Sequence, residues 1–152
     1  MKVLATNRRA RFDYDLGESM LAGISLEGHE VKVSRTAKPA SRVPFIVIKH
    51  GEAYLMGSHI TPYTQANNKL TIDPTRQRKL LLHRRQIDDL IAGKESGRSI
   101  VPTAFVLAGP FVKVELALGV GRKRYDKRAV LKARDDQRQT ARELVQRARH
   151  RN

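Results

Sequence analysis

The most concentrated chemistry in this sequence is positive charge near its end. From Gly119 to Asn152 the chain has twelve Lys and Arg residues against four Asp and Glu residues, so this stretch carries +8 of the formal net charge of +15. The densest part reads Gly121-Arg122-Lys123-Arg124-Tyr125-Asp126-Lys127-Arg128. Guanidinium and ammonium groups at this density bind phosphates and release their counterions. The sequence therefore predicts a segment that binds a polyanion.

No other group of residues has the spacing of a catalytic or metal site. Asp88 and Asp89 are neighbours in a helical pattern, so their side chains point about 100° apart and cannot act as an acid and base pair. Gly119-Val120-Gly121 lacks the third glycine and the Lys-Ser/Thr pair of a phosphate-binding loop. The chain has no Cys, and its histidines show no ligand spacing; they are His29, His50, His59, His83 and His150. We expect no catalytic residue, no metal and no cofactor.

Two further basic clusters lie before the tail. Arg8, Arg9 and Arg11 come early in the chain, bracketed by the aromatic residues Phe12 and Tyr14. The second cluster contains Arg76, Arg78, Lys79, Arg84 and Arg85. Each cluster by itself is compatible with a solvated arm or a solvated helix face. The occurrence of three clusters in one chain favours a shared surface for RNA.

A folded body formed by residues 1–120 has to carry these clusters. The β-rich runs are short, and they lie at residues 21–26, 30–33, 45–48, 53–56, 100–107 and 111–118. Apolar residues at helical spacing predict one helix over residues 76–94. Residues 34–44 predict a loop or a short helix, and residues 64–71 an exposed loop. This pattern predicts a mainly β fold with accessory helices, built as a small OB-type barrel.

The tail, residues 121–152, has few apolar residues, and most of them are small. They form a thin stripe at steps of three and four residues, consisting of Val130, Ala133, Gln137, Ala141, Leu144 and Ala148. Such a segment buries too little surface to offset its ordering entropy. We expect it to be disordered until it binds phosphates and helical afterwards.

The composition also limits the compartment and the class of protein. The pI of about 10.8 indicates a phosphate-rich partner. The first residues lack the apolar run of a signal peptide, and no apolar stretch reaches the length of about 18 residues that a membrane helix needs. We expect a soluble protein of the cytoplasm that has no membrane contact.

Several strings of this sequence together resemble one family, the SmpB family. They are Asn7-Arg8-Arg9-Ala10-Arg11-Phe12-Asp13-Tyr14, Gly23-Ile24-Ser25-Leu26-Glu27-Gly28-His29-Glu30-Val31-Lys32, His59-Ile60-Thr61-Pro62-Tyr63, Asp73-Pro74-Thr75-Arg76-Gln77-Arg78-Lys79-Leu80-Leu81-Leu82-His83-Arg84-Arg85 and Val114-Glu115-Leu116-Ala117-Leu118 with the tail motif Gly121–Arg128. The resemblance extends in register over almost the whole chain.

The resemblance implies a non-enzymatic RNA-binding adaptor of bacterial trans-translation. A protein of this kind binds the tRNA-like domain of tmRNA as a monomer, one copy per RNA, and brings it to stalled ribosomes. Its tail then enters the empty mRNA channel and reaches the small-subunit RNA at the decoding centre. By position, Asn7, Glu30 and the stretch Leu80–Leu82 match family residues important for RNA binding or for the surface that supports it. Together with the basic residues, the expected RNA-binding residues are Asn7, Arg8, Arg9, Arg11, Glu30, Lys32, Arg76, Arg78, Lys79, Leu81 and Arg84. The ribosome-binding residues would be Gly121, Arg122, Lys123, Arg124, Tyr125, Asp126, Lys127 and Arg128.

Residues 34–44 depart from the family pattern, and Ala108-Gly109-Pro110 replaces a more polar turn. Two other functions share the same charge and barrel. One is a structural ribosomal or general single-strand-binding OB protein, and the other is an enzyme acting on RNA.

Overall fold

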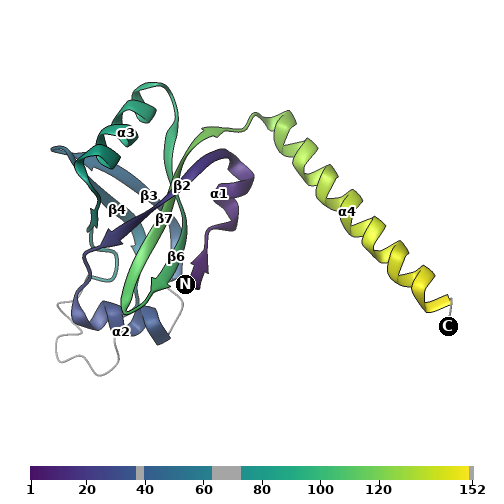
Figure 1. Ribbon diagram of the computed structural model, residues 1–152, viewed down its shortest axis with the longest axis horizontal. Coiled ribbons are helices and arrows are strands. Elements are labelled where there is room, and N and C mark those ends of the chain that lie inside the picture. The colour runs from purple at the N-terminus through teal and green to yellow at the C-terminus, as the bar shows by residue number, and fades with distance from the viewer. Residues whose placement is uncertain (37–39, 63–72, 151–152) are drawn as a thin grey trace. The chain divides into compact units, whose positions relative to one another are not determined.

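The computed structural model describes residues 1–36, 40–62 and 73–150, and the chain forms two compact units, Met1–Gly121 and Arg122–Asn152. The first unit, the body, contains in chain order β1 (Lys2–Thr6), α1 (Arg8–Asp13), β2 (Tyr14–Ile24), α2 (Gly28–Thr36), β3 (Ala40–Lys49), β4 (Glu52–His59), β5 (Arg78–Leu81), α3 (Arg84–Glu95), β6 (Ser99–Ala108) and β7 (Phe111–Gly121). The second unit, the tail, contains α4 (Arg124–His150). Figure 1 shows these elements.

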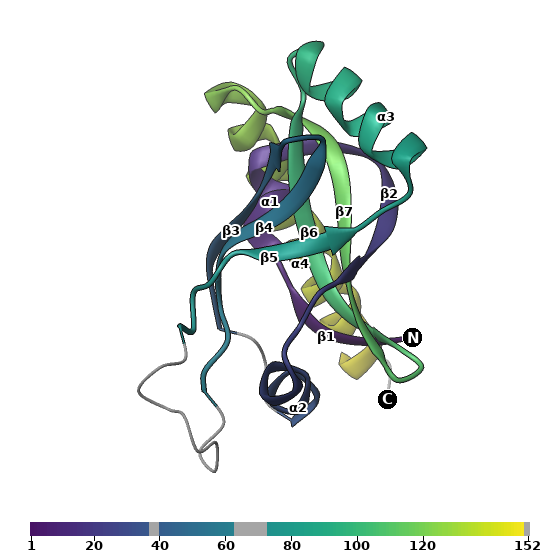
Figure 2. The same ribbon diagram turned by 90° about the vertical axis from the view of Figure 1, so that its left-hand side faces the viewer.

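The strands of the body form one antiparallel sheet in the order β1-β6-β7-β2-β5-β4-β3. The short strand β5 connects its two halves, because Leu80 pairs with Ile24 on β2 and Arg78 pairs with Leu55 on β4. The sheet curls until β3 packs against β6, although those two strands are not neighbours in the ladder (Figure 2). The fold is therefore mainly β with accessory helices, and within the described residues the curled sheet stays partly open.

The core lies inside this curl, and its side chains come from alternate positions of the strands. Ala22, Leu55, Leu80, Val114 and Leu116 are each completely buried. Helix α3 closes one end of the sheet with Leu90, whereas α2 lies at the other end (Figure 1 and Figure 2). Helices thus cover both ends of the sheet, and α3 carries Arg84 and Arg85 of the second basic cluster.

The predicted β-rich runs at residues 45–48 and 53–56 form one hairpin, and those at residues 100–107 and 111–118 form another. Strands β3 and β4 are joined at His50 and Gly51, which both have positive φ angles of 50° and 72°. Strands β6 and β7 are joined at Gly109, with a φ angle of 59°, and Pro110. Both turns were visible in the sequence because their residues favour this backbone conformation and alternating apolar runs flank them.

The prediction of a strand at residues 30–33 was wrong, because these residues belong to helix α2. Glu30, Val33 and Ser34 are buried, which is the spacing of one helix face. The carboxylate of Glu30 also accepts a hydrogen bond from the backbone N–H of Glu27 at 3.0 Å and so caps the first turn. The alternation of Val31 and Val33 favoured a strand as long as only neighbouring residues were considered. The residue that buries Glu30 and favours the helix, Arg78, is 48 positions away in the sequence.

The prediction of one helix over residues 76–94 was also wrong in its first half. Arg78 and Leu80 are buried while Lys79 and Leu81 are exposed, which is the period of a strand. The helix itself begins only at Arg84. Over a few residues, consecutive leucines fit the pattern of a helix or of a strand. Here they form a strand, because β5 pairs with β2 on one side and with β4 on the other.

The start of the chain is more ordered than an exposed arm. Residues Lys2–Thr6 form an edge strand, and Arg8–Asp13 form a short helix. The predicted loop at residues 64–71 lies outside the described residues. None of the helices in the described part of the chain is long and apolar enough to cross a membrane.

Candidate nucleic-acid interface

The first basic cluster is held on helix α1 by Asn7. Its side-chain oxygen accepts a hydrogen bond from the backbone N–H of Ala10 at 3.2 Å, which caps the helix. Its side-chain amide donates to the carbonyl of Pro102 at 2.9 Å, and its backbone N–H donates to the carbonyl of Thr103 at 2.7 Å. Asn7 therefore fastens α1 to β6, so its place in a nucleic-acid interface is to position the helix.

The arginines of α1 point away from this attachment. Ala10 is buried against the sheet, whereas Arg8, Arg9 and Arg11 are exposed. Arg9 also pairs with Asp13 at 3.2 Å, one helical turn later. A short helix thus presents three guanidinium groups in a fixed arrangement, which suits contacts to successive phosphates.

The second cluster contains a buried ion pair. Arg78 is completely buried, and its Nε donates to Glu30 Oε2 at 2.6 Å. Its other nitrogens donate to the carbonyl of Ser58 at 2.9 Å and to the carbonyl of Pro74 at 3.0 Å. Glu30 is only 1% exposed. Neither side chain can reach a nucleic acid, so the predicted contribution of Arg78 and Glu30 to binding can only be to support the surface.

Arg76 covers the outer side of this pair. Its Nε donates to Glu30 Oε1 at 2.9 Å, its Nη2 contacts the same carboxylate oxygen, and its Nη2 also donates to the carbonyl of Ser25 at 3.3 Å. Burial by itself raises the pKa of Glu30, but the hydrogen bonds from the Glu27 backbone, Arg76 and Arg78 outweigh it and leave that pKa below its usual range. Glu30 therefore stays ionised and ties α2 to β5.

Glu27, His29 and Glu30 place their ligand atoms within 4.8 Å of one another, which is a geometry that a metal ion could use. Both carboxylate oxygens of Glu30 already accept hydrogen bonds from arginine, however. Arg76 also lies 3.8 Å from Glu27. The two guanidinium groups thus supply the positive charge that these acids require.

Lys79 and Arg84 of the second cluster are exposed, as are the predicted residues Lys32 on α2 and Leu81 on β5. Lys79 lies 3.8 Å from Glu52, and the Leu81 residue is 56% exposed although its Cβ packs on Gly23. Arg84 donates to the carbonyl of Gly51 at 2.8 Å and pairs with Asp88 at 3.0 Å. Arg84 therefore links the β3–β4 turn to the start of α3, and Lys32 on α2 and Lys79 on β5 are both exposed lysines.

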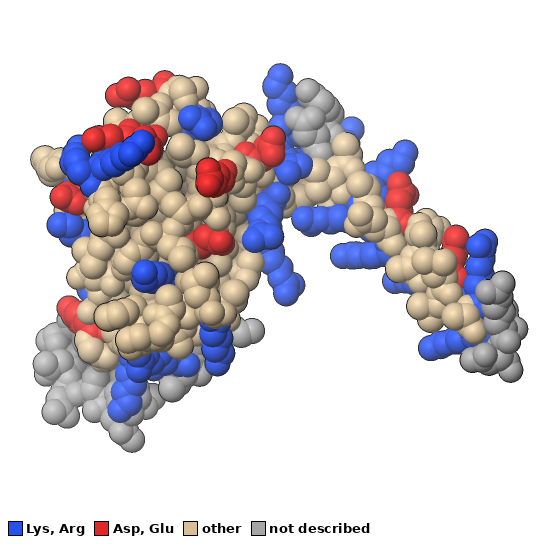
Figure 3. All heavy atoms as spheres, in the orientation of Figure 1, with Lys and Arg blue, Asp and Glu red and all other residues tan. Residues whose placement is uncertain are grey.

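The structure thus arranges the predicted body residues in two groups. One consists of Asn7 and the arginines of α1, and the other surrounds the Glu30–Arg78 pair. Figure 3 shows basic side chains at several places on the visible face of the body, with acidic ones between them.

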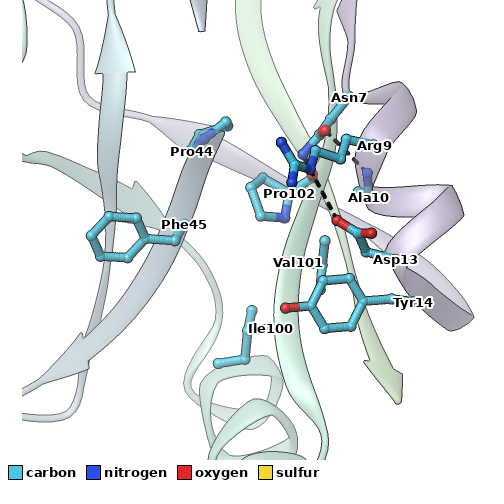
Figure 4. Close-up of a pocket in the computed structure, with 10 residues that line it drawn as sticks. All are labelled: Asn7, Arg9, Ala10, Asp13, Tyr14, Pro44, Phe45, Ile100, Val101 and Pro102. Carbon is cyan, nitrogen blue, oxygen red and sulfur yellow. Dashed lines mark hydrogen bonds and ion pairs between the residues drawn. The ribbon is translucent and has the colours of Figure 1, made fainter. Parts of the chain in front are cut away.

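Sequence reasoning missed a pocket beside α1. Figure 4 shows it between α1, strand β6 and strand β3, lined by Asn7, Arg9, Ala10, Asp13, Tyr14, Pro44, Phe45, Ile100, Val101 and Pro102. The sequence contained one signal for it, since Tyr14 follows the Arg-rich string directly. The residues of β3 and β6 could not be assigned to the same pocket before the curl of the sheet was known.

The predicted ribosome-binding residues lie at the end of β7 and the start of α4. Gly121 is exposed, and a Cβ atom added there would meet no atom within 4 Å. Lys123 and Arg128 are exposed, and Arg122 and Lys127 are half-buried. The backbone N–H of Lys127 donates to the carbonyl of Lys123 at 3.1 Å. Arg124, Tyr125 and Asp126 form the first turn of α4.

Helix α4 is 27 residues long, and its apolar residues Leu131 and Leu144 are 47% and 62% exposed. At 1.5 Å per residue it is about 40 Å long. Lys and Arg residues cover it along its length in Figure 3. The disorder of this segment before binding stays a prediction.

Comparison with known proteins agrees with these features. The family model described as SmpB protein matches residues 4–146. The chain is 44% identical over 148 residues to the SsrA-binding protein of Synechococcus sp. (strain JA-2-3B'a(2-13)), covering 97% of this chain and 96% of that protein. It is 46% identical over 137 residues to the SsrA-binding protein of Burkholderia lata, covering 90% of this chain and 93% of that protein.

A solved structure is similar as well. It is described as "tmRNA-SmpB: a journey to the center of the bacterial ribosome", and its matching chain is 37% identical with a TM-score of 0.64. The match covers 79% of this chain and 85% of that chain. Sequence and fold therefore agree, and the chain belongs to the SmpB protein family.

Proposed function

We propose that this chain is the tmRNA-binding adaptor of ribosome rescue. The observation that carries the proposal is that the highly basic tail, which contains most of the family's Gly121–Arg128 motif, is a compact unit separate from the folded body. The body would bind the tRNA-like domain of tmRNA, and the tail would enter the empty mRNA channel of a stalled ribosome. The names of the relatives and the described solved structure support both partners.

The body binds through surfaces that the fold has already arranged. The arginines of α1 would contact phosphates, while Lys32 and Lys79 would do so on the surface supported by Glu30 and Arg78. Because each cationic contact releases counterions, binding should weaken steeply as the salt concentration rises. The protein holds the RNA as a monomer in the cytoplasm and leaves its covalent bonds unchanged.

The tail acts after the RNA has been bound. A cationic helix of this length would lie along a channel lined by phosphates. The residues around Gly121 would lie at the entrance of that channel, near the decoding centre. There the tail would replace the contacts between codon and anticodon. Tagging of the nascent chain and release of the ribosome would then follow.

Separation of the two roles tests the proposal. A chain consisting of residues 1–121 keeps all of β7, including the pairs of Gly121 with Tyr14 and Gly119 with Leu16. It should bind the isolated tRNA-like domain nearly as tightly as the full chain and should fail to support tagging on stalled ribosomes. Loss of tight RNA binding in this chain would contradict the division of labour.

A full-length variant provides the matched control. Asp126→Ala, Lys127→Ala and Arg128→Ala together leave the body intact, so RNA binding should persist while tagging is lost. Normal tagging by this variant would overturn the assignment of the tail. Equal affinity for an unstructured RNA strand at physiological salt would favour a general single-strand-binding protein instead.

A further inference from the structure

The pocket beside α1 combines three kinds of surface within one hollow. Its apolar wall consists of Ile100, Val101 and Pro102 on β6, and all three are buried. In Figure 4 the ring of Tyr14 lies beside Val101 and Ile100, and Pro44 lies on the far side of Pro102. Arg9 and Asp13 form an ion pair at the α1 side. The hollow is thus apolar inside and charged at one edge.

Its size restricts the ligand. The cavity volume is about 100 Å³, whereas sites for drug-sized ligands and cofactors usually enclose about 300 Å³ or more. At about 30 Å³ per molecule, a volume of this size holds about three water molecules. It can therefore admit one small ring, and a folded peptide or a whole dinucleotide is too large.

The lining also restricts the chemistry of the ligand. A planar ring could lie against Tyr14 and the proline rings, and its polar edge would meet Arg9 and Asp13, which offer both donors and acceptors. Among the described residues the Tyr14 hydroxyl has no hydrogen-bond partner, so it adds one more polar group. A nucleobase matches this set, since it has flat faces for stacking and an edge of donors and acceptors.

The surroundings of the pocket indicate that such a base belongs to a nucleic acid. Arg8 and Arg11 are exposed on the same short helix, where they can bind the phosphates on either side of an inserted base. The helix is held in place, because Asn7 attaches it to Pro102 and Thr103. The pocket is therefore formed before the ligand arrives, which lowers the entropic cost of binding.

We propose that this pocket binds a single unpaired nucleobase of the RNA, stacked on Tyr14 and contacted at its edge by Arg9 and Asp13. The proposal rests on the proposed function, since it assigns one base contact within the RNA surface of the body. It distinguishes this contact from those to phosphates, which carry no sequence information.

Substitution of Tyr14 in the full chain tests the proposal. Loss of one stacked base typically weakens binding about 10-fold. Tyr14→Leu should therefore bind the tRNA-like domain of tmRNA about 10-fold more weakly than the unmodified chain. Tyr14→Phe keeps the aromatic ring and should keep most of the affinity. The slope of log affinity against log salt should stay unchanged in Tyr14→Leu. In Arg8→Gln with Arg11→Gln it should become shallower, because phosphate contacts are lost.

Phe111→Leu is the matched control. Phe111 is 67% exposed on β7 and begins the strand at the hairpin turn, away from residues 100–102 at the other end of β6. This variant should bind the RNA as the unmodified chain does. An equal loss of affinity in Phe111→Leu, or no loss in Tyr14→Leu, would overturn the assignment of the pocket.

A second measurement does not depend on any variant. AMP, GMP, CMP and UMP are titrated into the isotope-labelled full chain, with ribose 5-phosphate as the probe that lacks a base. At least one nucleotide should shift the amide signals of Tyr14, Ile100 and Val101 in a saturable way. Ribose 5-phosphate should shift only signals near Arg8 and Arg11. Identical shifts from all five probes would refute a base-binding pocket.

The two proposals fail in different ways. If the unmodified chain does not prefer tRNA-like RNA to an unstructured strand, the proposed function is wrong. If that preference holds while Tyr14→Leu binds normally and no nucleotide shifts the pocket signals, only the base-binding pocket is wrong.

Discussion

Arg78 Nε lies 2.6 Å from Glu30 Oε2, and neither side chain is exposed to solvent. The two residues are 48 positions apart in the sequence and belong to β5 and α2. This pair is the point where the helix at one end of the body is attached to the strand that joins the two halves of the sheet. Arg78 and Glu30 both lie within the family motifs, and this buried pair gives them a structural role that needs no contact with RNA.

Removal of one partner from this pair should strongly destabilise the body. Arg78→Met leaves the carboxylate of Glu30 with Arg76 alone and frees the carbonyls of Ser58 and Pro74, so we expect a loss of about 3–5 kcal/mol in the free energy of unfolding. Urea denaturation followed by circular dichroism measures it. Lys79→Met is the matched control on the exposed face of the same strand and should change stability by less than about 1 kcal/mol.

Stability should also depend on pH through Glu30. Its pKa in the folded chain is lowered from the usual 4.5, so the ionised carboxylate stabilises the fold above that value. The contribution is lost as the pH falls below 4.5 through the lower folded pKa. Urea denaturation between pH 7 and about pH 3 should therefore give a smaller loss of stability for Glu30→Gln than for the unmodified chain. Parallel pH profiles of the two proteins would contradict this assignment.

Gly93 and Leu118 should not tolerate an extra methyl group between α3 and β7. A Cβ atom at position 93 would overlap the Leu118 side chain. Alanine is a better helix former than glycine by about 1 kcal/mol, but overpacking costs about 1–3 kcal/mol. Gly93→Ala should thus lower the melting temperature, and Gly93→Ala combined with Leu118→Val should recover part of it. If Gly93→Ala melted at a higher temperature than the unmodified chain, the contact between α3 and Leu118 would have room for a methyl group, and this prediction would be wrong.

Gly119 and Gly121 should respond oppositely to alanine. A Cβ at position 119 would lie 2.9 Å from Leu16 Cδ2 and 3.1 Å from Tyr14 Cβ, whereas one at position 121 meets nothing within 4 Å. Gly119→Ala should destabilise the body by about 1–3 kcal/mol. Gly121→Ala should leave its stability within about 0.5 kcal/mol.

Thermal unfolding and a tagging assay on the same two variants complete this comparison. Because the fold itself makes no demand for glycine at position 121, any loss of tagging in Gly121→Ala has to come from what the tail contacts. Normal tagging in Gly121→Ala would show that the ribosome also accepts a side chain there.

Asn7→Ala should weaken the body and its RNA surface together. It removes the cap of α1 and the bond to Pro102, and each is worth about 1 kcal/mol. Asn7→Ser keeps a capping oxygen and removes the amide that donates to Pro102, so its stability should lie between those of the other two proteins. Urea denaturation of the three proteins measures these steps. Equal stability of Asn7→Ser and Asn7→Ala would mean that the cap contributes nothing.

Sequence patterns predicted those features that depend on neighbouring residues. The hairpins around Gly51 and Gly109 could be located because turn residues and the flanking alternation are local properties. The basic tail and its motif were visible for a similar reason, since charge density needs no fold to be read. The mainly β class followed from the number and length of the apolar runs.

Other features were decided by partners that are far apart in the chain. Residues Arg78–Leu81 became a strand because β2 and β4 leave a place for one, although the same leucines fit a helix. Residues 30–33 became helical because Arg78 buries Glu30 from 48 positions away. Local propensity differs by less than about 1 kcal/mol between such alternatives, so tertiary burial outweighs it.

In the candidate site too, some features follow from neighbouring residues and others from residues far apart in the chain. Residue types and order by themselves determined that this protein is cationic, that its tail carries the motif of its family, and that RNA is the partner to expect. Only the tertiary structure decided which cations reach the surface. It buries Arg78, exposes Arg8 and Arg11, and brings Tyr14 to Ile100 and Pro44, because the curl of the sheet joins segments that no local pattern connects.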